Sequence, residues 1–443
     1  MSRPSDPVRQ AFRGRFFHCL ADPGETGEPS ASEIYEDGLL LTEDGRVAEL
    51  GDAATLAPQI GDTPVEDFSG HLIVPGFIDC HVHFPQVDII ASYGEQLLEW
   101  LERYAYPGEM RYADRDYAAL AAEFFLDELL ANGTTTAAVF ATVHPQSADA
   151  LFAAADKRDM RLIAGKVWMD SNCPAELRDD AATALADSRA LIERWHGKGR
   201  LGYAITPRFA LTSSAAQLDA AGQLAKEFPD TWIHTHLAEN RGEVYAVAAR
   251  FPWSTSYLDV YEQFGLLRER SLFAHCLYLS ADDRKRMGEL GGAAAFCPTS
   301  NLFLGSGLFD LAAMTAASVR SGLASDVGGG TSLSMLRTMA TAYEVLHLQG
   351  QALPAARALY LATLGAARAL YLDDHIGNFE RGKEADFVVL NPAATAISKR
   401  RTDLADTIPE TLFAVLMLGD DRHVAASYLN GRLARQQTAP ADR

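Results

Sequence analysis

The sequence predicts an α/β protein, a (β/α)₈ barrel of the TIM type beside a small β-sandwich domain built from both chain ends. Eight short apolar runs alternate with amphipathic helical segments along the middle of the chain, which is typical of βα units in a parallel sheet. Strand-like pieces with turn signals lie on both sides of that region. We therefore expect the small domain to contain residues 1–72 and 377–443, and the barrel to contain residues 73–376.

The elements follow this plan in order along the chain. Residues 32–72 contain short strand-like pieces, and Asp44-Gly45 marks a tight hairpin. A helix is expected to begin at Thr212 or Ser213, which suit an N-cap, and "IGNFERGKEADFVVLN" and "HVAASYLNGRL" near the C-terminus are strand-like again. The predicted barrel strands are residues 72–83, 134–140, 161–169, 201–209, 232–239, 271–279, 292–300 and 321–327.

Composition narrows the classes of partner. The 443 residues carry 39 basic and 59 acidic side chains, a net charge of −20, without a block of Lys and Arg, which argues against nucleic acid and anionic membranes. We find no signal peptide and no apolar run long enough to cross a bilayer, so we expect a cytoplasmic protein, as a homodimer. The five cysteines are scattered without a C-x-x-C motif, so a metal must be held by His and carboxylate.

Polar residues that can bind a metal occur at the ends of four predicted strands. In "PGFIDCHVHFPQ" (residues 75–86), His81 and His83 are two residues apart on a strand, so their side chains point the same way. His236 ends the fifth run, His275 lies late in the sixth, and Asp326 ends the eighth. Active sites of such barrels lie at the C-terminal ends of the strands. The set predicts one zinc ion per chain, or iron, with an open position for water.

Other residues of the same types have a simpler interpretation. His234 has the parity of His236 and can line the barrel without binding a metal. Lys166 can in principle bridge two metals as a carbamate, but its position within the third run favours a structural role. A lone His on an apolar strand is more often a hydrogen-bonded core residue, and we interpret six others so: His71, His144, His196, His347, His375 and His423.

Several motifs together carry a family resemblance. "PGFIDCHVH", "HTHLAEN", "AHC" and "SDVGGG" resemble the metal-dependent amidohydrolase superfamily, in its mononuclear aminohydrolase branch. "QLLEWLERYAYPGE", "AGKVWMD", "TPRF" and "CPTSNLFLGSG", in this order and spacing, resemble the guanine deaminases within it. The resemblance covers most of residues 72–335. It implies hydrolytic deamination of guanine to xanthine and ammonia, in purine catabolism or salvage.

The resemblance also implies roles for individual residues. Glu239 would be the proton shuttle, and His275 would hold the metal-bound water, with Asp326 and His275 able to accept or steer its proton. The zinc ligands would be His81, His83, His236 and Asp326. The purine would be bound by Gln86, Arg208, Phe209 and Trp100, of which Trp100 lies in "LLEWL". The first two supply hydrogen bonds and the aromatic residues supply apolar faces.

Three other functions compete with this one. A related aminohydrolase acting on 8-oxoguanine, a pterin or a triazine would share the metal site but differ at Gln86 and Arg208. A non-catalytic scaffold would be expected to lose metal ligands, and this chain keeps all of them. The unrelated zinc nucleobase deaminases use an H-x-E motif with P-C-x-x-C, which is absent here.

Overall fold

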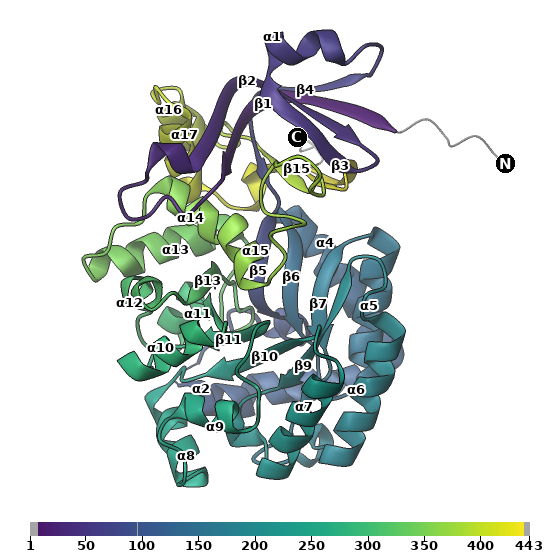
Figure 1. The fold of residues 1–443 in the computed structure, drawn as a ribbon, viewed down its shortest axis with the longest axis vertical. Coiled ribbons are helices and arrows are strands. Elements are labelled where there is room, and N and C mark those ends of the chain that lie inside the picture. The colour runs from purple at the N-terminus through teal and green to yellow at the C-terminus, as the bar shows by residue number, and fades with distance from the viewer. Residues whose placement is uncertain (1–7, 95, 438–443) are drawn as a thin grey trace, which may run out of the picture.

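The computed structural model describes residues 8–94 and 96–437 and consists of a parallel barrel and a separate mixed sheet. In Figure 1 the purple N-terminal strands and the yellow C-terminal elements lie together at the top, above the barrel. The expected small β domain from both chain ends and the expected barrel are therefore confirmed. The outer ends of the predicted small domain, residues 1–7 and 438–443, lie outside the described residues.

The barrel sheet has eight successive parallel strands. They are β5 (Phe77–His83), β6 (Thr134–Phe140), β7 (Arg161–Gly165), β9 (Leu201–Pro207), β10 (Trp232–Leu237), β11 (Ser271–His275), β12 (Ala293–Phe296) and β13 (Arg320–Leu323), and the short β8 (Val167–Trp168) pairs with β9. Beyond β13 the chain reaches back to β5: Asp326 N donates to His81 O at 2.9 Å, and His83 N donates to Val327 O at 2.8 Å. These bonds nearly close the barrel.

Helices surround the barrel strands (Figure 1). Ser214 caps α7 by accepting a hydrogen bond from Gln217 N, so the predicted caps Thr212 and Ser213 were wrong; residues 210–212 form a 3₁₀ turn that delays the helix. The helices between barrel strands are α2 (Leu97–Trp100), α3 (Tyr106–Met110), α4 (Arg115–Ala131), α5 (Pro145–Arg158), α6 (Ala181–Trp195), α7 (Ala215–Glu227), α8 (Arg241–Arg250), α9 (Tyr257–Gln263), α10 (Ala281–Glu289), α11 (Pro298–Phe303) and α12 (Leu311–Ala316). After β13 follow α13 (Met335–Leu348), α14 (Ala355–Leu361) and α15 (Leu364–Ala369).

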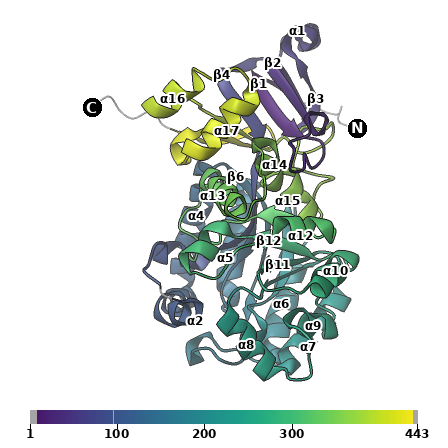
Figure 2. The ribbon, with the colours of Figure 1, turned by 90° about the vertical axis from the view of Figure 1, so that its left-hand side faces the viewer.

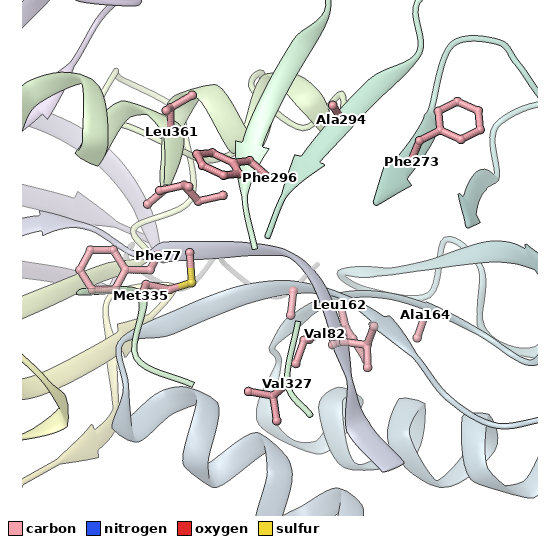
Figure 3. Packing of buried hydrophobic residues seen from close by; sticks show 14 of the residues in the cluster. Phe77, Val82, Leu162, Ala164, Phe273, Ala294, Phe296, Val327, Met335 and Leu361 are labelled. Atoms are coloured by element: carbon pink, nitrogen blue, oxygen red, sulfur yellow. The ribbon is translucent and has the colours of Figure 1, made fainter. Parts of the chain in front are cut away.

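Two apolar layers result from the alternation of strand side chains. Leu162, Ala164 and Phe273 belong to the cluster between strands and helices that Figure 3 shows. Ile163 and Ala274, one residue away, belong to a second cluster that draws apolar side chains, many of them alanine, from seven barrel strands and from α15. This inner layer fills the barrel below the carboxyl ends of the strands and supports the side chains at those ends.

The small sheet has the strand order β16-β15-β14-β4-β1-β2-β3. Its strands are β1 (Arg9–Cys19), β2 (Ser32–Glu43), β3 (Arg46–Asp52), β4 (Val65–Pro75), β14 (Phe387–Leu390), β15 (Val424–Leu429) and β16 (Arg432–Gln436). The short α1 (Ala53–Leu56) follows β3, and α16 (Ala396–Thr402) and α17 (Ile408–Leu418) lie beside the sheet (Figure 2). Among the described helices, none is both long and apolar enough to cross a membrane.

Several predicted strand boundaries were wrong. The first run is two strands, since β4 ends at Pro75 in the small sheet and β5 begins at Phe77 in the barrel. Gly76 separates them, where a Cβ would lie 2.0 Å from Thr135 Oγ1, so a larger residue does not fit. The sixth, seventh and eighth runs were predicted too long at their carboxyl ends, because the backbone leaves the strand just where the polar residues begin.

Candidate active site

Four side chains converge above the inner apolar layer. His81 Nε2 lies 3.2 Å from His83 Nε2, which lies 3.2 Å from His236 Nε2. Asp326 Oδ1 lies 3.2 Å from His81 Nε2 and 3.4 Å from His83 Nε2. His81 and His83 lie on β5, the first strand of the barrel. His236 lies on β10, and Asp326 lies in the loop after β13. All four residues are buried, and the four atoms form one compact group.

The donor set fits a metal ion. With zinc–ligand bonds of about 2.0–2.2 Å, two ligand atoms of one ion lie at most about 4.4 Å apart, and the separations of 3.2–3.4 Å fall within this limit. Burial lowers the pKa of His83 and His236 well below the usual range, so both imidazoles are neutral and present lone pairs. His236 Nδ1 donates to Arg208 O at 2.7 Å, which directs the Nε2 lone pair into the group.

The backbone is strained at two of the polar residues. His275 and Asp326 have φ values of 71° and 49°, in the left-handed region that residues other than glycine adopt at a cost of about 1–3 kcal/mol. These conformations end the sixth strand and shape the loop after the eighth, turning both side chains toward the metal group. Such strain is found at functional sites, because the surrounding structure must compensate for it.

Two residues orient the members of this group. His234 Nε2 lies 2.8 Å from His81 Nδ1, so His234 lines the barrel beside a potential ligand without belonging to the metal group. Asn301 Oδ1 lies 2.9 Å from His275 Nδ1. Sequence reasoning left the role of His234 open and missed Asn301, although "CPTSN" was among the motifs it used.

Glu239 lies beside the metal group. It follows β10 and is buried, with Oε2 at 3.4 Å from His275 Nε2, and Ser306 Oγ donates to its Oε1 at 3.0 Å. Burial raises the pKa of Glu239 to about 7, so it can hold or release a proton near neutrality. Burial lowers the pKa of His275, but the charges of Glu239 and Asp326 more than offset this and raise it. The pair can therefore bind and transfer protons.

A cavity of about 380 Å³ opens onto this centre. Gln86, Trp100, Arg208 and Phe209 line it, together with Glu239 and His275, so the structure brings the predicted substrate-binding and catalytic residues to one place. Leu97 and Leu101 form part of its wall with Trp100, which places the "LLEWL" segment over the cavity. Apolar and aromatic walls with a few polar groups are typical of small-molecule sites.

Glu109 was missed at the sequence level. This carboxylate on α3 is fully buried, and both of its oxygens accept from Arg208 Nη1 at 2.8 Å. Gln86 Nε2 donates to Oε1 of the same carboxylate at 2.9 Å. The residue closes "QLLEWLERYAYPGE", a motif already used for the resemblance, but its partners are 99 and 23 residues away and nothing in the local pattern indicates them.

The remaining candidates lie apart from the metal group. Lys166 is buried against the carboxylate of Asp179, an ion pair that agrees with the structural role predicted for it. The six histidines interpreted as hydrogen-bonded core residues are absent from the groups of potential metal ligands found in the described ranges. The core interpretation was wrong for His347 and His375, which are exposed, whereas His423 is buried. A further grouping joins His275, Cys297 and Asp326, but burial raises the thiol pKa of Cys297 well above its usual range, which disfavours the thiolate that a metal requires.

Barrel, metal group and acid–base pair together define a metal-dependent hydrolase, and comparison with known proteins gives the same class. The chain belongs to the amidohydrolase family, which matches residues 72–433. It is 50% identical to the guanine deaminase of Escherichia coli (strain K12) over 432 residues, 97% of this chain and 98% of that protein. The solved structure of E. coli guanine deaminase superimposes with a TM-score of 0.94, covering 97% of this chain and 100% of that one at 49% identity.

A second solved structure contains a ligand. Guanine deaminase from C. acetobutylicum with bound guanine in the active site is 28% identical, with a TM-score of 0.88 over 96% of this chain and 100% of that chain. The resemblance to the guanine deaminases inferred from the sequence motifs is therefore confirmed.

Proposed function

We propose that this chain is a guanine deaminase that hydrolyses guanine to xanthine and ammonia. The observation that carries the proposal is the single cavity in which Gln86 and Arg208 face the metal group and Glu239. Its polar residues are those expected to bind a purine. The similarity to guanine deaminases over nearly the whole chain supports the same substrate.

The proposed cofactor is one zinc ion per chain, with iron as the alternative. Its ligands would be His81, His83, His236 and Asp326, whose buried atoms lie close enough together to bind one ion. When bound, the metal supplies a Lewis acid that lowers the pKa of water toward about 7. The three imidazoles and one carboxylate are a donor set that suits zinc and also accepts iron.

The protein groups would move the protons. Glu239 accepts a proton from the attacking water and delivers it to a ring nitrogen, which makes the amino-bearing carbon more electrophilic. His275 and Asp326 hold that water beside Glu239, since their facing atoms lie 3.6 Å apart at the same end of the barrel. A new carbon–oxygen bond then replaces the carbon–nitrogen bond, and the departing amino group leaves as ammonia.

The substrate would be held by hydrogen bonds and apolar faces. Arg208 donates to the carbonyl oxygen of guanine, and the Gln86 carboxamide pairs with the neighbouring donor and acceptor atoms. Phe209 and Trp100 supply aromatic surface in the same cavity. The Arg208 donors that do not contact Glu109 favour an acceptor in the substrate, because a substrate donor placed there would leave both groups without a hydrogen bond.

The proposal also covers the domain boundaries, the cellular location and the oligomeric state. We place the first domain boundary at Gly76 instead of the predicted 72/73, because β4 pairs within the small sheet up to Pro75 and β5 of the barrel begins at Phe77, and we keep the second boundary at 376/377. A cytoplasmic location is supported by the similarity to the E. coli protein. A homodimer is supported by the exposed Leu120 and Phe124 on α4, one helical turn apart, and light scattering of the purified protein tests it.

A substrate panel tests the function. We expect the zinc-loaded protein to release ammonia from guanine with formation of xanthine, and to act far more slowly on adenine, 8-oxoguanine, pterins and triazines. Adenine is the matched control, since it has the size of guanine but carries its amino group at another ring carbon. Faster turnover of a pterin, a triazine or 8-oxoguanine than of guanine would assign the chain to the alternative, a related aminohydrolase.

A further inference from the structure

We propose that Glu109 is a positioning residue that sets which purine edge the cavity accepts, and this inference rests on the proposed function. Glu109 lies behind the cavity wall and is fully buried. Its carboxylate contacts both residues expected to bind the substrate edge: Arg208 through Nη1 and Gln86 through Nε2. One acid therefore holds two binding side chains that come from the segments after two different barrel strands, β5 and β9.

The orientation of Gln86 follows from these contacts. Both Glu109 oxygens accept hydrogen bonds from Arg208, and Oε1 also accepts from Gln86 Nε2, so the nitrogen of the Gln86 carboxamide faces Glu109. The oxygen then faces Gly328, whose N–H donates to it at 3.3 Å. The donor and acceptor that Gln86 presents to the cavity are thereby fixed. Without Glu109, a half-turn of the carboxamide would exchange them.

The orientation of Arg208 is set in the same way. Nη1 is occupied by both oxygens of Glu109, and the Tyr106 ring lies 5.5 Å from the guanidinium carbon. No described protein group accepts from its Nη2 or Nε, and Arg208 lines the cavity, so these donors are available to a ligand. A carbonyl oxygen satisfies them, whereas an amino group would oppose donor with donor.

A pair of substrates isolates this effect. 2,6-Diaminopurine keeps the amino group of guanine at the same ring carbon but replaces the carbonyl oxygen by an amino group and lacks the adjacent ring N–H. Water can replace that common amino group in both compounds, with loss of ammonia. The ratio of their kcat/KM values therefore measures how well the site recognises the carbonyl and ring N–H of guanine. It does not depend on which ring carbon the water attacks, because that carbon is the same in both compounds. A site built on hydrogen bonds can prefer guanine by roughly 10⁴-fold.

The variants are Glu109→Gln, which is isosteric and neutral, and Glu102→Gln as a matched control at an exposed acid in the segment just before α3. We expect Glu109→Gln to keep its zinc, to lose kcat/KM on guanine, and to narrow the guanine preference by about tenfold or more, because a neutral amide permits either orientation of Gln86. Glu102→Gln should match the parent on both substrates.

Two results would overturn the inference. One is an unchanged ratio in a folded, zinc-loaded Glu109→Gln; a purely structural role for Glu109 would lower both rates alike. If Glu109→Gln does not fold, Glu109→Asp is tested in its place, because the shorter side chain withdraws the carboxylate from Gln86. The second result that overturns the inference is a folded Glu109→Asp with the same guanine preference as the parent protein. The proposed function fails separately, if the parent protein itself releases no ammonia from guanine.

Discussion

Replacing Glu239 by Gln tests the proton shuttle directly. The change is isosteric, and the side-chain oxygen of Gln can still accept the hydrogen bond from Ser306 Oγ, 3.0 Å away in the parent. Glu239 is not among the four grouped ligand residues, so zinc should stay bound at about one ion per chain. What the variant loses is a group that can take up and release a proton.

The size of the effect follows from the buried position of the carboxylate. General acid–base catalysis contributes ~10²–10⁴-fold, or about 3–5 kcal/mol of activation free energy. Glu239 is 2% exposed, so bulk water cannot easily replace it as a proton acceptor. We therefore expect kcat to fall by about 10³-fold or more, with a small change in KM.

Ser306→Ala gives a graded perturbation of the same group. It removes one neutral hydrogen bond to Glu239, worth about 1 kcal/mol, so we expect kcat to fall about fivefold. Burial raises the pKa of Glu239 to about 7 and the Ser306 hydrogen bond lowers it, so this variant should raise it further. Because the shuttle must be ionised to accept a proton, activity is lost as pH falls, and the acid limb should move to higher pH.

The assay combines ammonia release from guanine with zinc content and thermal unfolding of each variant. Near-parental turnover of zinc-loaded Glu239→Gln would refute the shuttle assignment and move that role to His275. Loss of zinc from this variant would refute the argument that Glu239 is not a ligand. An acid limb that stays in place, or moves to lower pH, in Ser306→Ala would show that another group controls it.

The remaining predictions concern the metal, the substrate and the barrel. His236→Ala should lose both turnover and zinc, and elemental analysis measures the zinc content. A variant that retains its zinc would show that His236 is not a ligand. Arg208→Ala and Gln86→Ala should each keep zinc but lose guanine turnover by about 10–10³-fold in kcat/KM, and a parental value would point to another heterocycle. Gly165→Ala should lower the melting temperature, because its Cβ would lie 1.8 Å from Ala204 O, a backbone atom; overpacking typically costs about 1–3 kcal/mol, and an unchanged Tm would contradict the packing described.

The site was partly predictable because some of its geometry is local. His81 and His83 face the same way because strand side chains alternate, and a barrel brings the carboxyl ends of its strands together whatever loops connect them. The order of strands and helices could be predicted for the same reason. The two parts of the first predicted strand could not be separated, since apolar residues continue on both sides of Gly76 and the change of sheet depends on distant partners: β4 pairs with β1 and β14, and β5 pairs with β6.

By itself, the sequence determined the fold class, the metal-binding residue types and the family resemblance, because each is carried by spacing along one strand or by short motifs. Only the tertiary structure decided how the cavity is held. Glu109 touches Gln86 and Arg208 from a separate helix, and His234 supports His81 from the opposite side of the barrel. Such contacts join residues 23 to 153 positions apart in the sequence. A buried polar group finds its hydrogen-bond partner only when whole helices and strands pack together, and no local sequence pattern indicates that partner.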